Sequence, residues 1–199
     1  YMIGRTLLTD AERETIYKVQ PITFSMAEGT VTLDEAVDLW IFDQESAENL
    51  YGHISDWDTA CVTDMSDLFN GANTFNDDIS LWNTSNVINM LGMFRGAQNF
   101  NQEIGNWDVS NVTNMYEMFQ LAESFDEYIG NWNVSSVTNM QSMFNMAYNF
   151  NQDISNWDVS NVTNMSQLFA YAYSFNQNIG NWDVSNVLNM FMLFNSAYD

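Results

Sequence analysis

Residues 107–131 read WDVSNVTNMYEMFQLAESFDEYIGN, and this sequence pattern repeats every 25 residues along most of the chain. Its tryptophan recurs without insertion at six positions: Trp57, Trp82, Trp107, Trp132, Trp157 and Trp182. A strict period of this length is typical of repeat architectures, because one unit cannot bury its apolar face alone. A propeller blade needs about 40–45 residues. The repeat therefore predicts a solenoid of six coils, the last of them incomplete.

The apolar positions within one unit predict a short strand, a turn and a short helix. Val112, Met115 and Phe119 are spaced as on one face of a helix that Ser110 would cap. Ile104, next to Gly and Asn, and the residues around Trp107 suit an extended segment. We therefore expect an α/β fold: a right-handed solenoid of coils like leucine-rich repeats, with a parallel sheet of stacked strands.

The chain before the repeats divides into two further segments. Residues 33–55 are predicted to form a helical N-terminal cap of two helices. The signals are a capping box that begins at Thr32 and includes Glu35, and apolar residues at helical spacing. Residues 1–32 are predicted to form an extension, with a helix that starts near Thr9 and a strand over 22–26. Residues 56–199 then form the six-coil repeat region.

Composition excludes several classes of protein. The chain of 199 residues has 4 Lys and Arg against 26 Asp and Glu, a net charge of −22, and Arg95 is the single base after Lys18. Binding to nucleic acid or to anionic membranes through basic patches is therefore excluded. One cysteine excludes an internal disulfide, and no Cys/His spacing suits zinc. No apolar run approaches about 18 residues, so no membrane-spanning segment is expected.

Catalytic and metal sites are not indicated. The only histidine, His53, has no nucleophile paired with it, so we expect no enzyme and no catalytic residue. The position after each tryptophan carries Asp or Asn, which predicts a turn acceptor. We expect no metal and no cofactor. The alternative is calcium in the first coil, where carboxylates are dense, with these candidates: Asp56, Asp58, Asp77 and Asp78.

Two surfaces are candidates for binding a partner. Tyrosines gather in the later coils and predict an aromatic strip for a protein or a glycan: Tyr116, Tyr148, Tyr171, Tyr173 and Tyr198. The alternative is that these rings merely cover the surface of the coils. In the sixth coil Phe191 and Met192 stand where other coils mostly have polar residues. They predict an end that packs against another subunit, with these residues: Phe191, Met192 and Phe194.

The repeat spelling resembles a known family. The run from Val109 to Met115, with Met118 and Phe119, and the run from Phe150 to Trp157 resemble the BspA-like leucine-rich-repeat surface proteins over residues 33–199. The resemblance implies an extracellular or cell-surface protein that mediates adhesion or recognition, and it brings no catalytic residues. The alternative function is a structural subunit that packs through its C-terminal end into a larger assembly.

Overall fold

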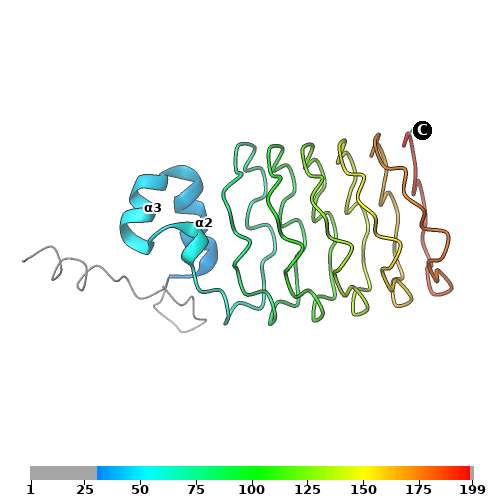
Figure 1. The fold of residues 1–199 in the computed structure, drawn as a ribbon, viewed down its shortest axis with the longest axis horizontal. Coiled ribbons are helices and arrows are strands. Elements are labelled where there is room, and N and C mark those ends of the chain that lie inside the picture. The colour runs from blue at the N-terminus through cyan, green and yellow to red at the C-terminus, as the bar shows by residue number, and fades with distance from the viewer. Residues whose placement is uncertain (1–30, 198–199) are drawn as a thin grey trace, which may run out of the picture.

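The computed structural model describes residues 31–197, which form two helices followed by a stack of coils (Figure 1). Helix α2 covers Leu33–Phe42, helix α3 covers Gln44–Tyr51, and a 3-10 turn, η1, covers Ile54–Asp56. The helices lie at one end of the stack, and the coils follow one another in sequence order to the other end. The helix expected near residue 9 and the strand expected over 22–26 lie outside the described residues.

The two helices confirm the signals found between residues 32 and 51. The Thr32 hydroxyl accepts a hydrogen bond from the Glu35 N–H at 3.2 Å, and the Glu35 carboxylate accepts one from the Thr32 N–H at 3.1 Å, which is the capping box. Trp40, on the buried side of α2, meets Trp57 edge-on at 5.7 Å. Its indole N–H also donates to Asp77 at 2.8 Å, so α2 is attached to the first coil.

The core consists of columns of like side chains, one from each coil. Phe94, for example, stacks on Phe69 and Phe119 at 5.4 and 5.5 Å, with the three rings nearly parallel. Within the coil Phe94 also stacks on Phe100 at 4.0 Å, and both rings are fully buried. Tryptophans form a further column, in which each indole N–H from Trp82 to Trp182 donates to the carbonyl 28 residues earlier. Each coil therefore completes the burial of its neighbours.

A backbone ladder joins each coil to the next. At every interface between coils, four alternate N–H groups donate to four carbonyls 24 residues later, at 2.7 to 3.0 Å. At the third interface the pairs are Met115 to Asn139, Glu117 to Gln141, Phe119 to Met143 and Leu121 to Asn145. This edge of a coil thus presents N–H groups to the following coil and carbonyls to the preceding one. A parallel β-strand instead offers N–H and carbonyl groups in alternation along each edge.

Two residues of every coil have the left-handed backbone conformation within this ladder. They stand two and six residues after the methionine that begins it, as Glu117 and Leu121 do, with φ of 55° and 60°. In the first two coils glycine fills three of these positions, Gly71, Gly92 and Gly96. A left-handed residue reverses the local path of the chain, so the segment advances by tight turns closed by hydrogen bonds over three residues, such as that from the Met118 N–H to the Met115 carbonyl at 3.2 Å.

The α/β prediction is therefore wrong. Within residues 31–197 the coils contain no strand and no α-helix, and the parallel β-bridge at each interface is isolated, as between Asn114 and Asn139. The apolar spacing of Val112, Met115 and Phe119 comes from a run of turns, because left-handed residues such as Glu117 cannot continue a helix. A leucine-rich-repeat solenoid with a strand in each coil is likewise not what these residues form.

The position after each tryptophan confirms the predicted turn acceptor. Its Asp or Asn oxygen accepts the N–H two residues later at 3.0 to 3.2 Å in all six coils, as Asp108 does from Ser110. Hydrogen bonds from the serine hydroxyl and N–H lower the pKa of Asp108, Asp158 and Asp183 below the ordinary value. The serines that the sequence suggested as helix caps are thus partners in these turns.

The replacement Gly96→Ala should lower the free energy of unfolding by about 1 kcal/mol, because Gly96 has φ of 71° and a side chain strains that conformation. An added Cβ meets the Gly71 Cα at an ordinary 3.5 Å, so the backbone conformation is the main cost. Urea unfolding measures the change. Gly96→Asn is the control and should cost less, since Asn tolerates this region best. Equal stability of Gly96→Ala and the parent would contradict the assignment.

The replacement Asp158→Asn should lower the melting temperature slightly at neutral pH and reduce its loss in acid. The lowered pKa of Asp158 stabilises the fold above the ordinary carboxyl pKa, and this contribution disappears as the pH falls through the lowered value. Asparagine makes the same turn without titrating. The converse variant, Asn133→Asp, adds a carboxylate between Asp108 and Asp158 and should lower the melting temperature at neutral pH and low salt. Parallel acid profiles of Asp158→Asn and the parent would refute the effect.

Candidate functional site

The tyrosines of the fourth and fifth coils form one cluster, which we call the tyrosine strip: Tyr148, Tyr171 and Tyr173. The rings of Tyr148 and Tyr173 are stacked with centroids 5.2 Å apart and an angle of 7° between them. Tyr171 meets Tyr173 edge-on at 6.4 Å. Tyr173 is 45% exposed, whereas Tyr148 and Tyr171 are half-buried. The repeat creates this stack because Tyr148 and Tyr173 occupy the same position in successive coils.

Glu123 extends the tyrosine strip by one coil, since it holds in the third coil the position of Tyr148 and Tyr173. Burial, the charge of Glu123 and the neighbouring Tyr173 together raise the pKa of Tyr148. The Glu123 carboxylate also accepts a hydrogen bond from the Gln98 amide at 2.8 Å. The tyrosine strip therefore combines aromatic surface with a carboxylate held in place beside it.

Tyr116 does not belong to the tyrosine strip. It lies beside Glu117, whose hydrogen bond is the main cause of the raised pKa of Tyr116. The Arg95 guanidinium pairs with Glu117 at 2.7 Å and with Asp67 at 3.3 Å, so it ties the first three coils together. Tyr198, which the sequence placed in the same column as Tyr148, lies outside the described residues.

The sixth coil presents an apolar surface, which we call the end face: Val184, Leu188, Met190, Phe191, Met192 and Phe194. Phe191 is 64% exposed and Phe194 47% exposed, although Phe194 stacks on Phe169 at 5.5 Å. The matching ring one coil earlier, Phe169, is fully buried.

The backbone at the end face presents N–H groups outward, as each earlier coil does toward the coil that follows it. The N–H groups of Met190, Met192, Phe194 and Ser196 stand where the ladder donors of the other coils stand, and they have no backbone acceptor among residues 31–197. In the other coils the matching N–H groups donate to carbonyls of the coil that follows. Packing of a subunit there stays a prediction.

Each of the four calcium candidates in the first coil accepts a hydrogen bond from a different donor. Asp77 accepts from the Trp40 indole, Asp58 from the Ala60 N–H at 3.0 Å, and Asp78 from the Ser80 N–H at 2.9 Å. Asp56 contacts the Ser55 hydroxyl at 3.4 Å. Over residues 31–197 the structure brings together no group of three or more Asp, Glu, His or Cys side chains that would suit a metal ion.

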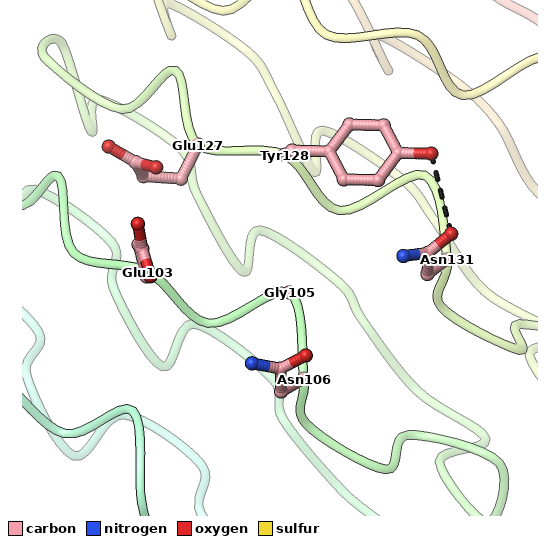
Figure 2. Close-up of a pocket in the computed structure, with 6 residues that line it drawn as sticks. All are labelled: Glu103, Gly105, Asn106, Glu127, Tyr128 and Asn131. Atoms are coloured by element: carbon pink, nitrogen blue, oxygen red, sulfur yellow. Dashed lines mark hydrogen bonds between the residues drawn. The ribbon is translucent and has the colours of Figure 1, made fainter.

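Sequence reasoning missed a shallow pocket of about 190 Å³ between the second and third coils (Figure 2). Six residues line it: Glu103, Gly105, Asn106, Glu127, Tyr128 and Asn131. A signal was present, because Glu103 and Tyr128 stand where other coils carry Asp or Asn.

His53, the one histidine, packs edge-on against Trp40 at 5.1 Å and shares a hydrogen bond of 2.8 Å with the Ser55 hydroxyl. The residue is exposed, so His53 lies at the surface against the edge of Trp40. Within the part of the chain that the structure describes, no helix has the length and apolar character needed to cross a bilayer.

Comparison with known proteins corrects the family suggested by the repeat spelling. The family whose profile matches is described as "Mycoplasma protein of unknown function, DUF285", over residues 39–133 and 126–199. The match names no BspA-like leucine-rich-repeat family, and the coils have no strand within the described residues, which agrees with that correction. No curated protein and no solved structure matches the chain. Because the profile covers most of its length, this chain belongs to the family described as DUF285.

Proposed function

We propose that this chain is a non-catalytic recognition protein of the cell surface or the extracellular medium, and that its tyrosine strip binds a basic segment of a protein partner. One observation carries the proposal: the stacked pair of Tyr148 and Tyr173 lies beside the Glu123 carboxylate. The net charge of −22 supports it.

The tyrosine strip suits the side chain of arginine. A planar guanidinium stacks on aromatic faces and donates hydrogen bonds to carboxylates and hydroxyls at the same time. Because Tyr173 stacks on one face of Tyr148, the other face is directed toward the coil of Glu123. A guanidinium between that face and Glu123 would meet a π-surface and a carboxylate together. Stacked tyrosines also have few rotatable bonds to immobilise on binding.

The charge of the whole molecule favours the same kind of partner. After Lys18 the chain has one base, Arg95, and that side chain is already paired with Asp67 and Glu117. A basic segment is therefore attracted over a distance set by the Debye length, about 8 Å at physiological salt, and its association is accelerated. The charge attracts any cation, whereas the tyrosine strip prefers arginine to lysine.

The double replacement Tyr148→Ala with Tyr173→Ala should weaken the binding of an oligoarginine peptide about tenfold, because it removes the stacking surface. Fluorescence anisotropy of the labelled peptide at physiological salt measures the affinity. The melting temperature should fall little, since neither side chain belongs to the buried core. An oligolysine peptide of equal charge should bind the parent more weakly than oligoarginine and respond less to the double replacement.

Two controls separate the tyrosine strip from general charge attraction. Tyr148→Phe with Tyr173→Phe keeps the aromatic faces and should retain most of the affinity. Tyr116→Ala removes a tyrosine outside the tyrosine strip and should leave oligoarginine binding unchanged. If the double alanine variant binds oligoarginine as tightly as the parent does, the tyrosine strip is not the binding surface and the proposal is wrong.

A further inference from the structure

One turn of the repeat is closed differently in two of the coils. In three coils an Asp or Asn oxygen accepts the N–H two residues later at 2.9 to 3.0 Å: Asp78 from Ser80, Asp153 from Ser155 and Asn178 from Gly180. Glu103 and Tyr128 take the place of that Asp or Asn in the two remaining coils. Neither can make this cap, since Glu is one carbon too long for the Asx turn and the tyrosine ring is too large.

Without the Asp or Asn cap, a backbone N–H group is left without an acceptor and a pocket opens beside it. The Gly105 N–H has no hydrogen-bond acceptor among residues 31–197, although the matching N–H groups of Ser80 and Ser155 are capped. Gly105 and Glu103 both line the pocket. Figure 2 shows the side chain of Glu103 directed away from Gly105. The pocket thus exists because two successive coils depart from the repeat at the same position.

Two glycines hold the tyrosine in the pocket wall. A Cβ on Gly130 would lie 2.7 Å from the Tyr128 hydroxyl and 2.8 Å from its ring, so glycine lets the ring lie along the coil. A Cβ on Gly105 would overlap the Tyr128 carbonyl oxygen, so glycine also permits the close approach of the two coils. The Tyr128 hydroxyl contacts the Asn131 side chain at 3.4 Å, and 47% of the residue stays exposed.

The lining of the pocket selects a class of ligand. Glu103 and Glu127 lie toward one end of the pocket (Figure 2). Asn131 and the Tyr128 hydroxyl lie at the other end, and Asn106 lies near Gly105. Carboxylates accept hydrogen bonds, and the amides and the Gly105 N–H donate them. With no base among the six residues that line the pocket, an anion is disfavoured. A ligand that carries both donors and acceptors and has an apolar face for the tyrosine ring satisfies this set.

From this geometry we infer that the pocket binds one neutral pyranose unit of a glycan. Sugar hydroxyls both donate and accept, so they pair with the carboxylates, the amides and the Gly105 N–H, while a C–H face of the ring packs on Tyr128. The volume of about 190 Å³ is below the range of about 300–1,000 Å³ typical of larger ligands, which limits the pocket to one sugar ring. The inference does not rest on the tyrosine strip or on its proposed partner.

Titration of the full chain with methyl glycosides of glucose, galactose and mannose tests the inference by amide NMR. At least one glycoside should shift the Gly105 and Asn106 amide signals, with a dissociation constant on the order of 1 mM. The decisive variant is Glu103→Asp, which restores the repeat's own cap on the Gly105 N–H and occupies the site. It should abolish the shifts without lowering the melting temperature.

Matched controls make the outcome specific. Asp153→Glu makes the opposite change at the same position of another coil and should leave glycoside binding unchanged. Tyr128→Ala should abolish binding, whereas Tyr173→Ala, in the tyrosine strip, should not. The inference is overturned if no glycoside moves the Gly105 signal, if Glu103→Asp binds as the parent does, or if only calcium or an alkylammonium ion produces the shifts.

Discussion

The ladder of hydrogen bonds between coils is the constraint on which the rest of the structure depends. Four N–H groups of one coil donate to four carbonyls of the next, and the direction is the same at every interface. Buried backbone groups must be paired, so a coil that contributes donors on one side requires an acceptor edge beside it. The left-handed residues, such as Glu117 and Leu121, maintain this polarity at a cost in backbone strain that the ladder and the stacked rings offset.

The columns of side chains follow from the ladder. Once the backbones are in register at 25 residues, like side chains are superposed, and Phe94 has to meet Phe69 and Phe119 face to face. The same superposition stacks Tyr148 on Tyr173 and sets Glu123 beside them, so the proposed binding surface is a product of the repeat. The pocket has the opposite origin. It arises where Glu103 and Tyr128 break the repeat.

The period, the two helices and the turn acceptors could be predicted from the sequence, whereas the backbone of the coils could not. Thr32 and Glu35 have the spacing of a capping box, and the Asp or Asn after each tryptophan is typical of a residue that closes a turn. The spacing of Val112, Met115 and Phe119 was misleading, because a run of turns can repeat the spacing of a helix. The residue types of Glu117 and Leu121 do not indicate a left-handed backbone, and only the glycines at 71, 92 and 96 point to this conformation at the matching positions. The tyrosine stack followed from the period, while the pocket depends on the missing cap at Gly105.

Amide hydrogen exchange tests the polarity of the ladder most directly. The Met165, Gln167, Phe169 and Tyr171 N–H groups donate to the sixth coil, whereas the matching groups of Met190, Met192, Phe194 and Ser196 have no backbone acceptor among the described residues. In the 199-residue chain the first four amides should exchange slowly and the second four rapidly. Equal protection of the two sets, with the chain monomeric by light scattering, would contradict a ladder in which each coil donates to the one that follows it.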